Sequence, residues 1–503
     1  MTKTIKSKKQ FFLLILITFV FLLAAFFRLW KLNLIPPGLY PDVAINGNDA
    51  LDTLESHHWK LFYPENNGRE GLFMWLIALS FVIFKPSVWA IKIVAAIIGI
   101  LTVIGFYLLT EELFRVRNQK LIENYKLKIE SSTAIALLSS FFLATSFWHV
   151  NFSRIGFRAI MVPFCLVFAF YFLFKGFSQK RTLFFIISGI FFGLGFYTYI
   201  SYRFIILLLP IGLLYWFLKY KKENNYKLFF NFSAFCLITT FLVALPIGVY
   251  FLLHPADFFG RASEVSIFSS ERPLYELTKA IVLHLAMFNF YGDTNWRHNF
   301  SGQPELFWPV GIFFLIGLIL SFKNKDYFLL SWFFIMLFPG FLSREGNPHA
   351  LRVIGSVPPV FIFSGLGSYW FLKEVNNFLK KNWQKTLFSF CFLLLLIYVA
   401  FGEFNRYFYQ WAKRAETESA FSKDYYELGN YLNSLPDNVS KYVIVNQNGV
   451  PVPFPNGIPM PAQTPMFIER AKFGKIRATY LLPEDLKKIK IEEDAIVIPL
   501  HKP

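Results

Sequence analysis

The chain of 503 residues is 55% hydrophobic and only 16% charged, and its formal net charge is +18. Soluble globular domains carry about 25% charged residues, so this composition excludes an ordinary soluble enzyme. Apolar runs of about 17–25 residues, the length that crosses a bilayer as a helix, recur along the chain. The sequence therefore predicts an all-α polytopic membrane protein.

The first predicted span follows a basic N-terminal segment, "MTKTIKSKKQ". The apolar run after it has about 20 residues and no small-residue cleavage site follows, which indicates an uncleaved helix with a cytoplasmic N-terminus. With this helix, about eleven transmembrane helices are expected. The others are predicted at 88–110, 131–149, 159–175, 182–199, 203–219, 228–253, 308–322, 327–342, 353–372 and 386–402. The run at 71–84 is too short to cross comfortably and is predicted to be re-entrant or interfacial.

The positive charge follows this topology. The segments predicted inside, such as 111–130, 219–227 and 373–385, are rich in Lys and Arg, as cytoplasmic loops are. The excess of positive charge is therefore explained by the cytoplasmic loops, and nucleic acid is not an expected partner. We expect a plasma-membrane protein whose extracytoplasmic loops are 31–87, 149–158, 200–203, 254–307 and 343–352.

The tail after the last span has a different composition. Residues 403–503 are polar, and "KYVIVNQ" and "DAIVIPL" alternate as strands do, around helical patterns. The sequence therefore predicts a membrane domain over 1–402 and a small extracytoplasmic α/β domain over 403–503.

The first predicted outside loop contains an acid cluster in "LIPPGLYPDVAINGNDALDTLESHHW". Asp42 follows a proline and is predicted to cap a helix that begins at about Val43. Asp49, Asp52 and Glu55 follow at helical spacing, and a cap with a solvated face is the alternative interpretation. An Asp is ionised at neutral pH and can accept a proton from a hydroxyl group. Asp42 is therefore the predicted catalytic base, with Asp49 as the second candidate.

Basic residues gather near helix ends in the outside loops. Guanidinium groups match phosphate in a bidentate way, and a phosphate at this depth belongs to a phospholipid or a polyprenyl-phosphate carrier. A phosphate leaves as a stable anion, so sugar transfer from such a carrier needs a base but little acid assistance. The predicted phosphate-binding residues are Arg69, Arg154, Arg158, His349 and Arg352.

The long outside loop 254–307 carries further polar residues. Its segment 276–290 is amphipathic and is expected to lie at the membrane interface. The predicted contacts to sugar or acceptor are Asp293, Asn295, Trp296, Arg297 and His298, and a satisfied polar network is the alternative. No metal is required by the predicted reaction. A divalent metal is possible because Asp, Glu and His are plentiful outside, but no ligand spacing is diagnostic.

Several motifs together resemble a known family. "PPGLYPDVAINGNDAL", "NNGREGLFMWL", "SFWHVNFSRIGFR", "YGDTNWRHNFSGQP" and "SREGNPHALRVIGSVPP" occur in an order similar to that of the membrane-embedded GT-C glycosyltransferases of family 39. That family includes the protein O-mannosyltransferases and the bacterial aminoarabinose transferase acting on lipid A, and the chain looks like an uncharacterised bacterial branch of it.

The resemblance implies inverting transfer from a polyprenyl-phosphate sugar. It places Asp42 at the family's catalytic Asp, whereas Val43 stands where the family has Glu, and Asp49 is the acid that could substitute. It also matches Arg69 to a basic residue of the family, and it places Arg154 near the carrier phosphate.

Two other functions compete with this prediction. A transporter or flippase for a lipid-linked glycan should place charges inside its spans, facing a central path. The predicted spans are nearly free of charge, with Lys92 as the main exception, which favours the enzyme. A scaffold that only displays the tail would explain neither the arginines nor the long loops. The expected partners are a polyprenyl-phosphate-linked sugar, membrane lipids and an acceptor that is a glycan, a lipid or a protein.

Overall fold

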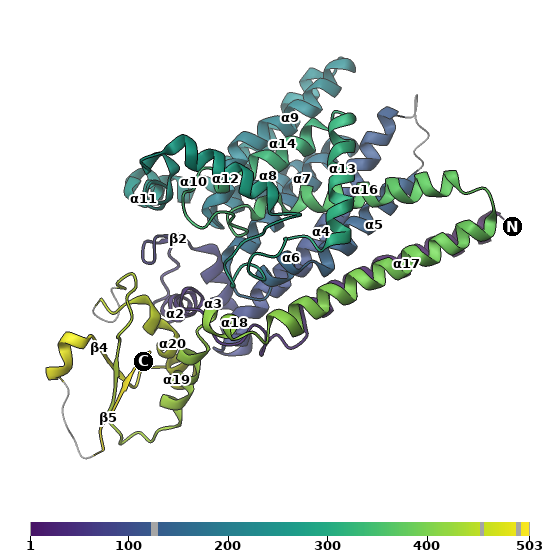
Figure 1. Ribbon diagram of the computed structural model, residues 1–503. Coiled ribbons are helices and arrows are strands. Elements are labelled where there is room, and N and C mark those ends of the chain that lie inside the picture. Colours follow the sequence, from purple (N-terminus) through teal and green to yellow (C-terminus); the bar gives the residue numbers. More distant parts are fainter. Residues whose placement is uncertain (1, 122–128, 453–456, 489–493, 502–503) are drawn as a thin grey trace.

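The computed structural model describes residues 2–121, 129–452, 457–488 and 494–501. Figure 1 shows a large helical body with a smaller α/β part against one end, and the N-terminus lies at the opposite end.

The α-helices up to the last predicted span are α1 (Thr2–Leu29), α2 (Pro41–Ser56), α3 (Leu72–Phe84), α4 (Val88–Leu121), α5 (Ile129–Thr145), α6 (Phe147–Phe152), α7 (Met161–Gln179), α8 (Thr182–Leu194), α9 (Ile205–Lys222), α10 (Tyr226–Leu253), α11 (Pro255–Val265), α12 (Pro273–Ala286), α13 (Trp308–Lys323), α14 (Tyr327–Ile335), α15 (Phe338–Phe341), α16 (Val357–Phe378) and α17 (Asn382–Asn405). Short 3₁₀ turns join them: η1 (Arg158–Ile160), η2 (Gly195–Tyr197), η3 (Ile200–Phe204), η4 (Ile267–Ser269) and η5 (Ile354–Ser356). A short hairpin, β1 (Phe62–Tyr63) and β2 (Arg69–Glu70), stands between α2 and α3.

The predicted spans all coincide with helices, and the segment predicted over 327–342 is divided into α14 and α15. Among the described residues, six helical segments are long and apolar enough to cross a membrane, and five shorter apolar helices accompany them, one of which is α3. The protein is therefore a multi-pass membrane protein, and the exact number of spans and their sidedness stay predictions.

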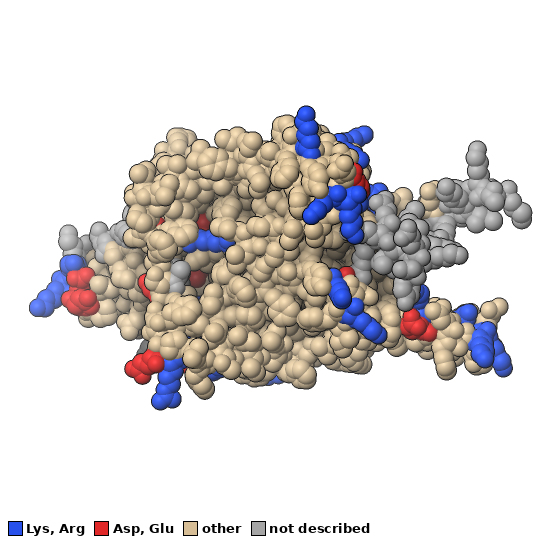
Figure 2. Space-filling model, turned by 90° about the horizontal axis from the view of Figure 1, so that it is seen from above, with Lys and Arg blue, Asp and Glu red and all other residues tan. Residues whose placement is uncertain are grey.

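The outer surface of the bundle suits lipid. Only 11% of the apolar window of α10, and 17% of those of α1 and α17, is buried inside the protein. Their outward Phe and Leu side chains would be costly in water but not in a bilayer. Figure 2 shows the same feature, because the middle of the face seen from above is almost uncharged.

Small residues allow close helix packing in the core. A Cβ atom on Gly317 of α13 would lie 1.8 Å from the carbonyl oxygen of Phe363 in α16, and one on Gly367 of α16 would lie 2.0 Å from that of Phe313. Without a hydrophobic drive in lipid, such close backbone contact is what holds helices together. The close packing of α13 against α16 therefore depends on these two glycines.

The C-terminal part follows α17 and a π-helical turn, η6 (Arg406–Trp411). Its elements are α18 (Ala415–Ala420), α19 (Lys423–Ser434), β3 (Lys441–Ile444), η7 (Met460–Ala462), α20 (Gln463–Phe473), β4 (Thr479–Leu481), η8 (Pro483–Lys488) and β5 (Ile496–Pro499). The three strands form a parallel sheet in the order β4-β3-β5. The last long helix continues to Asn405 and the π-helical turn to Trp411, and the division into domains at residue 402 stays a prediction.

One local prediction is wrong. Asp42 does not cap a helix at Val43, because α2 begins at Pro41 with Tyr40 as its N-cap residue. Proline is favoured at the first helical position, since its missing N–H group would have no partner there. The helix therefore starts earlier than predicted, and the Asp42 side chain is left for other contacts.

Candidate functional site

A cavity of about 680 Å³ opens at the end of the helical body that carries α2 and α11. All the loops predicted outside contribute to its wall, so tertiary folding brings them to one place. Figure 2 shows a hollow in this region with charged side chains inside it. The lining acids are Asp42, Glu70 and Asp257, and the lining bases are Arg158, Arg203, Arg297 and Arg352, together with His298 and His349.

Helix α2 places Asp42 at the cavity. Pro41 starts the helix, and Asp42 lies in its first turn, half-buried. The Asn66 side chain, from the β1–β2 connection, donates a hydrogen bond of 2.9 Å to Oδ1 of Asp42. Asp42 forms no ion pair within the part of the chain that the structure describes. Its carboxylate is therefore held in position but keeps capacity to accept a proton.

Asp49 and Arg69 pair with each other behind this wall. Nη1 of buried Arg69 donates to Oδ2 of Asp49 at 2.5 Å and to the Asn46 side chain at 2.9 Å, and its Nε donates to the Glu65 carbonyl oxygen. Neither Asp49 nor Arg69 lines the cavity. The pair joins α2 to β2, so it supports the helix that carries Asp42.

Glu70, which is not among the residues predicted from the sequence, lines the cavity beside two arginines. Its carboxylate is buried, 3.2 Å from Nε of Arg158 and 3.8 Å from Nη2 of Arg203. Arg158 also donates to the Gly68 carbonyl oxygen, and Arg203 to that of Phe258. Glu70 thus fixes the two guanidinium groups at the cavity wall. Its place next to Arg69 in "NNGREGLF" was the available sequence signal.

The loop after α12 is fixed by groups far away in the sequence. Nδ2 of Asn151 donates to the Arg297 carbonyl oxygen at 2.7 Å, and the indole of Trp411 donates to that of Trp296 at 3.0 Å. The Arg297 guanidinium lies over the Tyr40 ring, 4.0 Å from its centroid, directly before α2. The loop and the start of α2 therefore form one wall of the cavity. The π-helical turn η6 stabilises this wall through Trp411.

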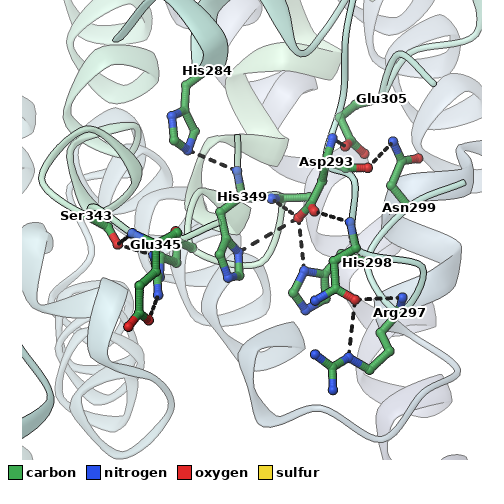
Figure 3. A network of polar contacts seen from close by, with 12 residues as sticks. His284, Asp293, Arg297, His298, Asn299, Glu305, Ser343, Glu345 and His349 are labelled. Atoms are coloured by element: carbon green, nitrogen blue, oxygen red, sulfur yellow. Dashed lines mark hydrogen bonds and ion pairs between the residues drawn. The ribbon is translucent and has the colours of Figure 1, made fainter. Parts of the chain in front are cut away.

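Asp293 is the centre of a buried polar network (Figure 3). Its Oδ2 accepts the Ala350 N–H at 2.8 Å and lies 2.9 Å from Nδ1 of His298 and 3.9 Å from Nδ1 of His349. Burial, reinforced by the positive field of nearby groups, holds the pKa of His349 well below its usual range, so this imidazole is neutral. The one-carboxylate, two-imidazole set is the group of described residues best suited to hold a metal ion.

Glu305 supports the same network from behind. Its Oε1 accepts the Asp293 N–H at 3.1 Å. Burial, and then the charge of Asp293, raise the pKa of Glu305 well above its usual range. This shift favours the protonated form, and the side chain stabilises the loop through its hydrogen bond to Asp293.

Arg154 does not reach the cavity. Its buried guanidinium donates to four backbone carbonyl oxygens, those of Phe27, Arg28, Trp30 and Ile35, at 2.8–3.0 Å. Lys92 is used in the same way, with Nζ donating to the Pro36 carbonyl oxygen. These buried cations supply hydrogen bonds to the backbone carbonyl oxygens at the end of α1 and in the segment that follows it.

Most of the residues predicted from the sequence therefore meet in the cavity, and some do not. Those that line it are Asp42, Arg158, Asn295, Arg297, His298, His349 and Arg352. Asp293 and Trp296 lie in the same loop as Asn295, Arg297 and His298. Asp49, Arg69 and Arg154 bind other protein groups. Arg203, Glu70 and Asp257 are lining residues that were not among the predicted site residues.

The C-terminal part docks on the helix that carries Asp42. Buried Arg470 of α20 lies 2.7 Å from Asp52 and 3.0 Å from Glu55 of α2. The side chains of Asn48 and Gln463 are also hydrogen-bonded, at 2.8 Å. Asp52 and Glu55 of the predicted acid face thus form an interface with the tail, whereas Asp49 pairs with Arg69.

Comparison with known proteins supports the fold. No protein-family model matches the chain, and no curated protein matches its sequence. Among solved structures, it is similar to ArnT from Cupriavidus metallidurans bound to undecaprenyl phosphate, with a TM-score of 0.51 and 11% identity over 93% of this chain and 85% of that one. The apo structure of the same protein gives a TM-score of 0.52 over 94% and 86%, again at 11% identity. The chain therefore has the GT-C fold.

Proposed function

We propose that the chain is a glycosyltransferase that moves a hexose or pentose from a polyprenyl-phosphate carrier to an acceptor hydroxyl group, on the extracytoplasmic side of the plasma membrane. The acceptor belongs to a glycan, a lipid or a protein. One observation carries the proposal: Asp42, without an ion pair among the described residues, shares a cavity with Arg158, Arg203, Arg297 and Arg352. The likeness to a protein crystallised with undecaprenyl phosphate supports the carrier class, and the sequence resemblance to family 39 supports the reaction.

In the proposed reaction, Asp42 takes the proton of the acceptor hydroxyl group. The acceptor oxygen then forms a bond to the anomeric carbon, and the bond from that carbon to the phosphate oxygen breaks. The phosphate keeps the electron pair and leaves as an anion. A single displacement inverts the anomeric configuration, and it requires one base and no carboxylate nucleophile.

Asp42 suits the role of base better than the other lining acids. Glu70 is committed to two arginines. Asp257 and Asp42 each accept one neutral hydrogen bond, from Tyr250 and Asn66, and the resemblance to family 39 favours Asp42 of these two. We assign the carrier phosphate to Arg158, Arg203 and Arg352, because guanidinium groups bind phosphate strongly. We assign sugar and acceptor contacts to the loop that presents Asn295 and Arg297. Arg69 and Arg154 keep supporting roles.

The flippase alternative is less consistent with the buried cations. A transport path needs charged groups that face it, but Lys92 and Arg154 are bonded to backbone carbonyl oxygens. These two cations therefore stabilise the chain and offer no charge to a transport path.

The test is transfer of radiolabelled sugar from undecaprenyl-phosphate-linked donors to native membranes by the purified full chain. Asp42→Asn is expected to lower the rate at least about 100-fold, the lower range for general-base catalysis. Asp52→Asn, on the same helix but facing the tail, is the matched control and should keep the rate within about twofold. A near wild-type rate for Asp42→Asn rejects the base assignment. Donor movement between leaflets without a new glycoside identifies a transporter instead.

A further inference from the structure

The loops at the cavity bring together three groups of metal-ligand type. Asp293 and His298 come from the loop between α12 and α13, and His349 comes from the loop between α15 and η5. One ligand atom from each lies within 4.8 Å of the other two, and the two imidazole rings have centroids 4.7 Å apart. A tetrahedral ion with bonds of about 2.0–2.2 Å holds its ligand atoms about 3.3–3.6 Å apart, so the three side chains would close around it by about 1 Å.

Hydrogen bonding inside the protein does not explain this arrangement completely. Oδ2 of Asp293 already accepts the Ala350 N–H and faces Nδ1 of His298. Nδ1 of His349 is buried 3.9 Å from the same oxygen and has no hydrogen-bond partner among the described residues. A buried polar nitrogen without a partner is costly. An ion bound between the three groups would engage it.

The surrounding contacts orient the three groups in advance. The Asn295 N–H donates to Oδ1 of Asp293 at 2.8 Å. The His349 N–H donates to Nε2 of His284 at 3.1 Å (Figure 3). His284 in turn is held by the Ala280 carbonyl oxygen at 2.8 Å. Such outer contacts are typical of metal sites, where they fix the direction of each ligand.

We propose that Asp293, His298 and His349 bind one divalent transition-metal ion, with Zn²⁺ as the best match. Two imidazoles and one carboxylate suit zinc and its neighbours, whereas Mg²⁺ and Ca²⁺ prefer oxygen ligands alone. His298 and His349 both line the cavity that contains Asp42, so the remaining coordination position opens toward substrate. That is the arrangement of a catalytic rather than a structural site. An oxygen of a bound substrate would occupy this position.

Metal content of the full chain tests the proposal, and it does not depend on the glycosyltransferase assignment. Protein without a polyhistidine tag is purified in detergent, equilibrated with ZnCl₂, passed through metal-free buffer and analysed by mass spectrometry of the elements. Wild type should retain about one zinc per chain, and His349→Gln or Asp293→Asn should weaken retention by at least about tenfold. His254→Gln is the control, because His254 is an exposed imidazole at the end of α10 outside the cluster.

Folding of each variant is checked by size-exclusion chromatography. Cobalt substitution of the wild-type protein gives a second readout that needs no variant, since Co²⁺ bound by nitrogen and oxygen in a tetrahedral site absorbs visible light strongly. Background zinc in wild type, equal retention by His349→Gln, retention of Mg²⁺ in preference to Zn²⁺, or the weak spectrum of hydrated cobalt would each overturn the proposal. Zinc retention without sugar transfer would keep the metal site and reject the proposed function.

Discussion

Removal of Arg470 should weaken both the protein and its proposed activity, because this side chain fastens the C-terminal part to the helix that carries Asp42. In Arg470→Ala, the ion pairs with Asp52 and Glu55 are lost together with a weak bond to the Asn48 carbonyl oxygen. The guanidinium is buried, with 6% exposure, but the two carboxylates are 53% and 59% exposed.

The magnitude follows from this asymmetry. Removing one partner of a fully buried pair costs about 3–5 kcal/mol, because the other charge stays buried without compensation. Here both acids remain solvated, so each pair contributes at most about 1 kcal/mol. The lost packing of the buried arginine stem adds to this. We expect the free energy of unfolding to fall by about 2–3 kcal/mol in total.

The assay is chemical unfolding in mild detergent, with the rate of sugar transfer measured on the same samples. Lys488→Ala is the control, because Lys488 is 68% exposed and pairs with Asp485 on the same C-terminal part, and its loss should change stability by less than about 0.5 kcal/mol. The reasoning is refuted if Arg470→Ala changes neither unfolding nor transfer more than Lys488→Ala does. A double-mutant cycle with Asp52→Asn should give a coupling of about 0.5–1 kcal/mol.

Two further predictions separate structural from ligand-binding residues. Arg154→Ala should lower stability by at least about 3 kcal/mol, since four carbonyl oxygens lose their donor. Arg352→Ala should mainly weaken donor binding, by about 1.5–3 kcal/mol, because its partner Glu345 is 49% exposed and stays solvated. Thermal unfolding and a binding titration with undecaprenyl phosphate distinguish the two, and the opposite pattern would return Arg154 to the phosphate site. Gly317→Ala should lower the free energy of unfolding by about 1–3 kcal/mol, because the added Cβ would meet the Phe363 carbonyl oxygen. The control Gly248→Ala, whose Cβ meets no atom within 4 Å, should be neutral or slightly stabilising in the same thermal assay. Equal effects of the two variants would contradict the close contact between α13 and α16.

The local pattern was sufficient to predict the membrane class and the helices. Apolar length is a property of each segment alone, and a helix in lipid satisfies its own backbone, so the predicted spans coincide with helices. The loops predicted outside could be grouped because membrane topology alternates from span to span, and the side of the membrane that they face stays a prediction. These loops do meet at one cavity.

Tertiary structure decided which side chain does what within that set. Arg154 and Arg158 are four residues apart in similar surroundings, but carbonyl oxygens from the end of α1 occupy the first, and the second faces the cavity beside Glu70. Nothing near them in sequence distinguishes the two. Likewise, His349 meets Asp293 only because two distant loops pack together. Periodicity reports which way a residue faces along its own helix, whereas the partner of a buried charge is chosen by elements that packing brings from elsewhere in the chain.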